Sequence, residues 1–270
     1  MPEKTLGVIG GGIMGEALLS RLIAQGIFLP ESIVVSDPQI ERLKYLEQTY
    51  GVKTTPSNAT VVSQAQVLLL AIKPQTLSSV SEDLADLPTS YSPLALSILA
   101  GVTLDRLRLC FPSWTIVRAM PNTPATIGAG MTALAAGPEV TSDQWRQARE
   151  IFASVGSVVD VPEGWMDGVT AVSGSGPGYI ALLVEALADG GVAVGLPRTT
   201  AMELALQTVK GTAQLLQETR LHPGVLKDRV TSPGGTTIAG IAELETAGFR
   251  AALMAAVRAA YQRSKELGQS

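Results

Sequence analysis

Short apolar runs alternate with longer amphipathic stretches along the first 161 residues of the chain. The unbroken run VLLLAI at residues 67–72 is typical of a strand that is buried on both faces of a sheet. Strands are predicted at residues 5–10, 32–37, 67–72, 93–101, 115–120, 131–137 and 157–161, with helices between them that include 13–25 and 142–155. This alternation predicts an α/β fold with a parallel, doubly wound Rossmann-type sheet.

The turn after the first predicted strand reads GGGIMG and fits the pattern G-x-G-x-x-G with Gly10, Gly12 and Gly15. A helix is predicted to start directly after it, and Asp37 ends the second strand 22 positions after Gly15. This spacing is close to that of an acid that binds the ribose of a dinucleotide. We therefore predict dinucleotide binding, and the alternative is a glycine-rich turn without a ligand.

Loops rich in glycine, proline and small polar residues follow the other predicted strands. Ligands of doubly wound sheets bind at the carboxyl ends of the strands, where these loops lie. In AMPNTPA, at residues 119–125, Asn122 and Thr123 are expected to present an amide and a hydroxyl to a nicotinamide ring. A tight turn without such a role is the alternative, and Lys73 in AIKPQ is either a cofactor contact or a solvated lysine.

After Pro162 the apolar runs give way to alanine-rich helical patterns. Helices are predicted near residues 178–194, 198–217 and 249–267, with breaks at SGSGPGY (173–179) and HPG (222–224). Two domains are therefore expected, a dinucleotide-binding domain at residues 1–162 and an all-α domain at 163–270.

The chain is apolar, since hydrophobic residues make up 46% of it and charged residues only 16%. Much of the excess is alanine in the predicted helices of the second half. Such helices often bury a second face against a partner subunit.

The segment TSPGGTTIAG, at residues 231–240, precedes a short predicted helix and holds a proline, three glycines and four hydroxyl side chains. One interpretation is a capped turn with Ser232 as the N-cap residue and Pro233 as the first helical residue. The other is an anion site, because the unpaired N–H groups of a helix N-terminus attract negative charge and glycines let an anion approach the backbone.

Composition narrows the function further. The net charge is −4 without any basic run, which argues against a nucleic-acid partner. Cys110 is the single cysteine and His222 the single histidine, so neither an intrachain disulfide nor a metal site is expected. No uninterrupted apolar run has the length of a membrane span, and a reduced, cytoplasmic protein is the expectation.

The scarcity of histidine bears on the reaction. Reduction of a ketone by hydride produces an alkoxide that needs a proton from an acid. A protonated imine already carries the positive charge that hydride neutralises, so orientation and hydrogen bonds matter more than a strong acid. The composition is therefore compatible with imine reduction, although a lysine, tyrosine or threonine could also donate a proton.

Motifs along nearly the whole chain resemble those of the pyrroline-5-carboxylate reductases. They are, in order, GVIGGGIMGEAL, LLLAIKPQ, LAGVTLDRL, VRAMPNTPA, VSGSGPGY, ADGGVAVGLPR, HPGVLKDRVTSPGGTTI and GFRAAL. The resemblance implies reduction of Δ1-pyrroline-5-carboxylate to L-proline, the last step of proline biosynthesis, with NADPH or NADH. It also implies a helical dimerisation domain, and a homodimer that can assemble into a decamer of five dimers.

The resemblance also implies the site residues. Thr237 matches the threonine that hydrogen-bonds the ring nitrogen of the substrate and is expected to be catalytic. Substrate binding is expected at Ser232, Gly234, Gly235, Thr236 and Thr237. Cofactor binding is expected at Gly10, Gly12, Ile13, Met14, Gly15, Ser36, Asp37, Asn58, Ala71, Lys73, Pro74, Asn122 and Thr123.

Asp37 departs from the family pattern, in which NADPH-preferring members have a small or polar residue. An acid at this position favours a free ribose 2′-hydroxyl and repels a 2′-phosphate. Ser36 and Arg42 could donate to a phosphate, so the sequence leaves the coenzyme preference open. Two other functions also stay open: a β-hydroxyacid dehydrogenase, although the helix after SGSGPG has no lysine before Lys210, and a non-catalytic dinucleotide sensor.

Overall fold

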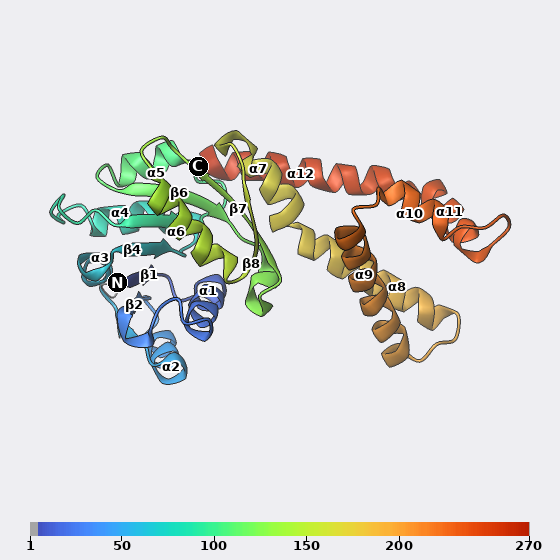
Figure 1. The fold of residues 1–270 in the computed structure, drawn as a ribbon, viewed down its shortest axis with the longest axis horizontal. Coiled ribbons are helices and arrows are strands. Elements are labelled where there is room, and N and C mark those ends of the chain that lie inside the picture. Colours follow the sequence, from blue (N-terminus) through green and yellow to red (C-terminus); the bar gives the residue numbers. More distant parts are fainter. Residues whose placement is uncertain (1–4, 270) are drawn as a thin grey trace. The chain divides into compact units, whose positions relative to one another are not determined.

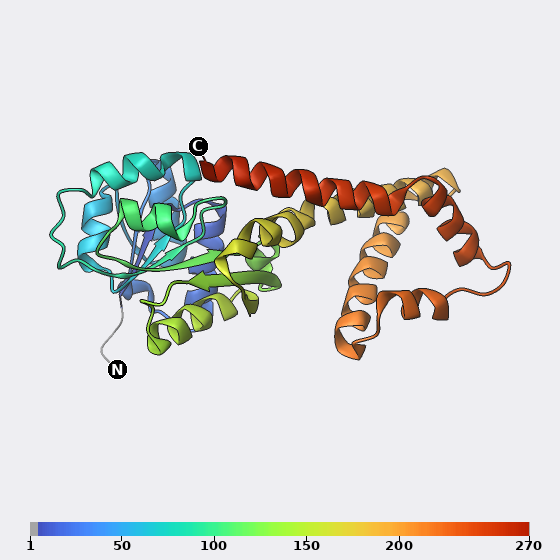
Figure 2. The same cartoon turned by 90° about the horizontal axis from the view of Figure 1, so that it is seen from above.

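The computed structural model describes residues 5–269, which form two compact units. The sheet unit comprises the described residues up to Ser175 and those from Ala259 onward, and the helical unit is Gly176–Arg258. Figures 1 and 2 show the elements of both units from two directions. The division differs from the expected boundary at residue 162, because residues 163–175 and the end of the chain belong to the sheet unit.

The sheet unit is built on one eight-stranded sheet with the order β3-β2-β1-β4-β5-β6-β7-β8. The seven expected strands are present, and β3 was not foreseen because it has only three residues. The strands are β1 (Leu6–Ile9), β2 (Ile33–Ser36), β3 (Lys53–Thr55), β4 (Val67–Leu70), β5 (Leu94–Ser97), β6 (Thr115–Met120), β7 (Gly130–Ala136) and β8 (Gly156–Asp160).

The register aligns the carboxyl ends of the strands in the middle of the sheet. Ile9, the last residue of β1, pairs with Ser36 of β2 and with Leu70 of β4. The chain therefore leaves all three strands at the same level, so Gly10, Asp37 and Ala71 follow at one edge of the sheet. A doubly wound sheet binds its ligands at this edge.

The sheet is parallel as expected, with the exception of one pair of strands. β7 runs antiparallel to β6, and β8 runs parallel to β7. The connection at residues 121–129 contains only the 3₁₀ helix η3 (Thr123–Ile127), whereas a parallel connection needs a crossover of a dozen residues or more. This short return keeps the AMPNTPA loop against β7.

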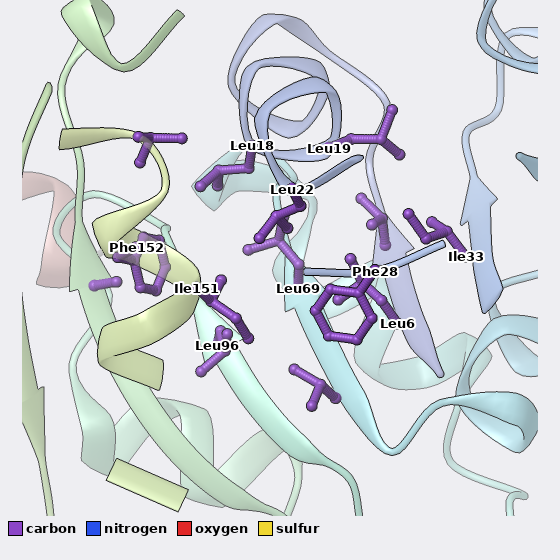
Figure 3. Close-up of a cluster of buried hydrophobic side chains, with 14 of the residues drawn as sticks. Leu6, Leu18, Leu19, Leu22, Phe28, Ile33, Leu69, Leu96, Ile151 and Phe152 are labelled. Carbon is purple, nitrogen blue, oxygen red and sulfur yellow. The ribbon is translucent and has the colours of Figure 1, made fainter. Parts of the chain in front are cut away.

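Helices cover both faces of the sheet and bury two clusters of apolar side chains. Alternate residues of each strand serve the two clusters, since successive side chains point to opposite faces. Leu6, Leu69 and Leu96 face α1 and α6 in the cluster drawn in Figure 3. The helices are α1 (Ile13–Ala24), α2 (Ile40–Tyr50), α3 (Asn58–Gln64), α4 (Leu77–Asp83), α5 (Leu104–Cys110) and α6 (Ser142–Ala153), with the 3₁₀ helices η1 (Pro30–Ser32) and η2 (Pro74–Thr76).

The expected break at SGSGPGY is absent. Residues 163–193 form a continuous helical stretch, made of η4 (Glu163–Trp165), α7 (Met166–Val169), the π-helical segment η5 (Thr170–Gly174) and α8 (Gly176–Ala193). Ser175 N–H donates to Thr170 O at 2.8 Å, so one wide turn accommodates the glycines and serines without ending the helix. By length and composition alone, this stretch is apolar enough to cross a membrane.

The helical unit has a small core of its own. Val184 and Ala188 of α8 pack against Ala201 and Ala205 of α9 (Arg198–Thr219). The remaining helices are α10 (Pro223–Arg229), α11 (Thr236–Thr246) and α12 (Phe249–Gln269). The HPG turn proves to be the start of α10, where His222 Nδ1 caps the helix by accepting from Gly224 N–H at 3.1 Å.

The last turns of α12 return to the sheet unit. Ser264 Oγ donates to Asp167 Oδ1 at 2.6 Å. Gly101 and Gly268 approach closely, because a Cβ atom on Gly268 would lie 2.3 Å from the carbonyl oxygen of Gly101. The sheet unit is therefore completed by residues from both ends of the chain.

Candidate functional site

The glycine-rich turn between β1 and α1 is shaped by two close approaches. Gly10 has a φ of +100°, and a Cβ there would lie 2.6 Å from Ala71 O. A Cβ on Gly15 would lie 2.3 Å from Gly10 O. Side chains are therefore excluded at both positions, which brings the start of α1 tightly against the ends of β1 and β4.

Gly12 is different, because a Cβ there would meet no protein atom within 4 Å. It is the N-cap residue of α1 and makes no side-chain cap, and the neighbouring Ile13 is 76% exposed. The start of this twelve-residue helix is thus uncapped, and no protein atom covers its backbone at Gly12. Such a cradle fits the pyrophosphate of a dinucleotide.

Asp37 holds the glycine-rich turn from the end of β2. Its Oδ2 accepts from Gly11 N–H at 2.9 Å, and its Oδ1 accepts from Gln39 N–H at 2.9 Å. The neighbouring Ser36 Oγ donates to Asn58 Oδ1 at 2.7 Å, and Asn58 Nδ2 donates to Asp83 Oδ2 at 3.0 Å. Asp37 is therefore bonded to the backbone of the glycine-rich turn, while Ser36 and Asn58 are bonded to each other.

A cluster of four side chains, Glu16, Arg42, Tyr45 and Tyr50, lies beside this turn. Arg42 Nη2 donates to Glu16 Oε2, while the hydroxyls of Tyr50 and Tyr45 donate to Glu16 Oε1 at 2.7 and 3.1 Å. Burial alone would raise the pKa of Glu16, but these hydrogen bonds outweigh it and the pKa lies below its usual value. Burial and the Glu16 carboxylate raise the pKa of Tyr50.

We refer to these four residues as the Glu16 cluster. Arg42 was expected near the coenzyme from the sequence, but Glu16 and the two tyrosines were not. Glu16 lies on α1, whereas Arg42, Tyr45 and Tyr50 lie on α2, so the cluster forms only when these helices meet. A charged residue in the apolar stretch of α1, at position 16, was the one available signal.

Asn122 has a structural task in the AMPNTPA loop. Its Oδ1 accepts from Met131 N–H at 2.9 Å, and its Nδ2 donates to Ser173 O at 3.1 Å. The carboxamide thus links the end of β6 to the start of β7 and to the π-helical segment η5. Thr123, the first residue of η3, is exposed beside it, as is Lys73 at the start of η2.

The segment TSPGGTT forms a tight turn followed by an uncapped helix. Gly235 N–H donates to Ser232 O at 2.9 Å, and Gly234 has a φ of +67°, as the third residue of a type II turn with Pro233 at its second position. α11 begins at Thr236, and its N-cap residue is Gly235, which makes no side-chain cap. The capped-turn interpretation, with Ser232 as the N-cap residue, is therefore wrong, and the anion-site interpretation stays a prediction.

This start of α11 leaves donors available. The side chains of Ser232, Thr236 and Thr237 are exposed within the helical unit, and Ala239 N–H is the first to bond back to Gly235 O. Backbone N–H groups and three hydroxyls thus surround the start of an eleven-residue helix, which is a suitable receptor for a carboxylate. Among residues 5–269, no group of three or more metal-ligating side chains is found.

The expected residues therefore form two half-sites. The residues expected to bind the coenzyme gather at the carboxyl edge of the sheet, and those expected to bind the substrate gather at the start of α11 in the helical unit. A bare helix N-terminus for an anion occurs in both, so both half-sites suit ligands with negative groups.

Family models match both parts of the chain. Residues 163–267 match the family described as pyrroline-5-carboxylate reductase dimerisation. Residues 5–101 match the family described as NADP oxidoreductase, coenzyme F420-dependent. The second match covers the glycine-rich turn, β2 and β4, which carry most of the coenzyme half-site.

Relatives match over the full length. The chain is 58% identical to pyrroline-5-carboxylate reductase of Synechocystis sp., over 98% of each chain. It is 47% identical to that of Methanosarcina acetivorans, over 100% of each chain. The crystal structure of Plasmodium falciparum pyrroline carboxylate reductase with NADP bound has a TM-score of 0.89 at 31% identity, over 99% of each chain. The Coxiella burnetii reductase structure has a TM-score of 0.90 at 37% identity, over 99% of this chain and 100% of the other. The chain belongs to the pyrroline-5-carboxylate reductase family.

Proposed function

We propose that this protein reduces the C=N bond of Δ1-pyrroline-5-carboxylate to give L-proline, with NADPH as the coenzyme and NADH as an alternative. The observation that carries the proposal is the uncapped start of α11, where a Pro-Gly turn exposes N–H groups and hydroxyls. Full-length identity to reductases of this name, up to 58% among those compared above, supports it.

The start of α11 would bind the substrate. The hydroxyl of Ser232 and the backbone at Gly234, Gly235 and Thr236 would hold the carboxylate, whose negative charge suits the partial positive charge of the helix N-terminus. Thr237 would hydrogen-bond the ring nitrogen, and we assign it the catalytic role. An exposed threonine one residue inside the helix has its hydroxyl free to point toward a ligand.

The carboxyl edge of the sheet would bind the coenzyme. Gly10, Gly12 and Gly15 shape the turn that receives the pyrophosphate, and Asp37 lies where the adenosine ribose binds in such sheets. Asn122 would act by fixing its loop, since its carboxamide already bonds to Met131 and Ser173. The other contacts are proposed at Ile13, Met14, Ser36, Asn58, Ala71, Lys73, Pro74 and Thr123.

The chemistry requires little acid catalysis from the protein. When bound, the reduced nicotinamide supplies a hydride to the imine carbon, and the electron pair of the C=N bond goes to the protonated nitrogen. The protein must hold the ring so that this carbon faces the coenzyme, and Thr237 would fix the position of the nitrogen. Orientation of this kind accounts for a large part of the rate in many enzymes.

We further propose a homodimer formed through the helical unit, and a decamer of five such dimers as the larger assembly. The match of residues 163–267 to a dimerisation family supports the dimer. Exposed apolar side chains on α8 and α9 support it too, because a partner would cover them. A cytoplasmic location is proposed because the single cysteine, Cys110, leaves no intrachain disulfide to stabilise the fold outside the cell.

The test is the loss of nicotinamide absorbance when purified protein meets pyrroline-5-carboxylate, run in parallel with NADPH and NADH. Substrate-dependent oxidation is the expected result, and it should fall in the Thr237→Ala variant. A folded protein that binds a coenzyme but oxidises neither in the presence of this substrate would contradict the proposal. A dinucleotide sensor would then be favoured. If the protein instead oxidises a β-hydroxyacid and reduces NADP⁺, a β-hydroxyacid dehydrogenase would be favoured.

A further inference from the structure

The Glu16 cluster directly contacts the glycine-rich turn of the coenzyme half-site. Arg42 is tied at two points, since its Nε donates to Gly11 O and its Nη2 donates to Glu16. The tyrosine hydroxyls occupy the other carboxylate oxygen of Glu16. The side chains of Arg42 and Glu16 are 24% and 21% exposed, so the pair is half-buried at the edge of the site.

Asp37 and Arg42 approach the same backbone unit from two directions. A Cβ on Gly11 would lie 3.5 Å from Asp37 Oδ2 and 3.6 Å from Arg42 Cγ. In dinucleotide-binding sheets the acid after the second strand marks the place of the ribose 2′ position. The group on that carbon, a hydroxyl in NADH or a phosphate in NADPH, would therefore lie beside both Asp37 and Arg42.

The local charge disfavours a phosphate there. Asp37 and Glu16 each contribute one negative charge and Arg42 contributes one positive charge, which leaves a net charge of about −1. Arg42 contacts this turn through Gly11 O, and its guanidinium is already paired with the Glu16 carboxylate. A 2′-phosphate can gain a charge-assisted hydrogen bond from Arg42 only in competition with that carboxylate.

We propose that Glu16 is a specificity-determining residue for the coenzyme, which restrains Arg42 and so lowers the affinity for NADPH relative to NADH. Tyr45 and Tyr50 fix the carboxylate in the position that holds Arg42. The inference rests on the proposed coenzyme site, and Glu16 acts through Arg42 without touching the coenzyme itself.

The test measures the dissociation constants of NADP⁺ and NAD⁺, and of 2′,5′-ADP and 5′-AMP, by calorimetry without substrate. Glu16→Gln keeps the shape and an acceptor for the tyrosines but removes the charge. It should tighten binding of NADP⁺ and 2′,5′-ADP about tenfold and leave NAD⁺ and 5′-AMP unchanged. Adding Arg42→Ala to this variant should abolish the gain.

Glu41→Gln is the matched control. Glu41 lies on α2 and pairs with Lys44 at 2.9 Å, but its side chain is 86% exposed, and the tyrosine hydroxyls bond to Glu16 instead. Its removal changes net charge as Glu16→Gln does and should leave all four constants unchanged. Tyr45→Phe keeps every charge and loosens Glu16, so it should shift NADP⁺ affinity in the same direction by a smaller factor.

Weaker NADP⁺ binding in Glu16→Gln would overturn the inference, because Glu16 would then orient Arg42 onto the phosphate. Equal changes for NADP⁺ and NAD⁺ would also overturn it, because the effect would not concern the 2′ group. If Glu16→Gln does not fold, Tyr45→Phe takes its place, and an unchanged ratio of the NADP⁺ and NAD⁺ dissociation constants in that variant overturns the inference. Absence of binding of any of the four ligands to the unaltered protein would overturn the proposed coenzyme site together with this inference.

Discussion

The sheet unit buries large apolar side chains, whereas the helical unit leaves many of its large apolar side chains exposed. In the sheet unit, large residues such as Leu6, Leu69 and Phe152 are fully buried between sheet and helices. In the helical unit, Leu182 and Leu204 are 67% and 53% exposed, and the buried core consists of small side chains on α8 and α9. The first unit thus contains its own hydrophobic core, and the second needs another surface to cover its apolar side chains.

The two half-sites show the same contrast. The side chains of the proposed coenzyme half-site are bonded within the protein, with Asp37 bonded to Gly11, Ser36 to Asn58 and Asn122 to Ser173. The proposed substrate half-site presents exposed hydroxyls and an uncapped helix. Preorganisation therefore characterises the unit with a complete core, while the unit with an incomplete one offers open donors.

Gly10→Val should have the largest effect on stability and coenzyme binding, because Gly10 lies where β1 and the residue after β4 approach too closely for a side chain. The new side chain would require a positive φ and would overlap Ala71 O, at a cost of about 3 kcal/mol or more. We expect loss of the folded sheet unit or of coenzyme binding, measured by thermal unfolding and by calorimetry with NADP⁺. In Gly12→Ala the added carbon meets no protein atom, so the melting temperature should stay while binding weakens. A stable Gly10→Val that binds normally would contradict this.

Leu182→Glu should break the assembly through the helical unit. If a partner covers position 182, a glutamate there would bury an unpaired charge. This would weaken the free energy of association by several kcal/mol. The expected result is a shift to monomer in size-exclusion chromatography with light scattering. Leu109→Glu is the control in the sheet unit, where the side chain is 82% exposed and should stay solvated. Identical oligomers from both variants would remove the distinction between the units.

Thr237→Ala should lower kcat/KM about 100-fold, as expected for removal of one well-placed donor. The Thr237 side chain is exposed, and within residues 5–269 its hydroxyl has no hydrogen-bond partner, so the melting temperature should not change. Thr246→Ala, at the other end of α11, removes only a hydroxyl bonded to Ala242 O and should leave kcat/KM intact. Equal kinetics in the two variants would remove the proposed role of Thr237.

Asp37→Ser should shift the ratio of kcat/KM for NADPH over NADH upward by about tenfold, because a negative charge beside the 2′ position is lost. Serine can still accept from Gly11 or Gln39 N–H, so the turn should keep its shape. An unchanged ratio would mean that Asp37 serves only to hold the turn.

A small pH effect is expected from Glu139. Burial alone raises the pKa of Glu139, but hydrogen bonds from Arg108 outweigh it and the folded-state pKa lies below its usual value. Its stabilisation is therefore complete above the unfolded-state pKa and is lost as pH falls through the folded-state pKa. Since the pair is partly exposed, Glu139→Gln should lower the free energy of unfolding at pH 7 by less than about 1 kcal/mol and have little effect at pH 3. Urea unfolding at the two pH values measures this, and an equal loss at both would exclude an ionic contribution.

The sequence predicts local features of this molecule well. Apolar strand runs, the GGGIMG turn and the residues that follow each strand are set by neighbours along the chain, so the strands and the glycine-rich turn could be predicted in advance, while binding at this turn stays a prediction. The N-cap at Gly235 was missed because Ser232 and Pro233 are also good helix starters. Local preference could not decide between two starts three residues apart.

Long-range pairings could not be read from the sequence. Asn122 bonds to Ser173, and Glu16 to Arg42, across 51 and 26 positions. The antiparallel turn into β7 depends on the length of one loop, and the π-helical segment η5 depends on what packs around it. Such features arise only when distant elements meet, which periodicity and spacing do not encode.

The close approach of Gly101 and Gly268 has a consequence for synthesis of the protein. The helical unit is inserted between two parts of the sheet unit, whose final turns come from the last residues of α12. A ribosome therefore releases the whole helical unit before the contact between Ser264 and Asp167 can form. A chain that stops at residue 258 would lose part of its N-terminal unit, even though every strand had already been made.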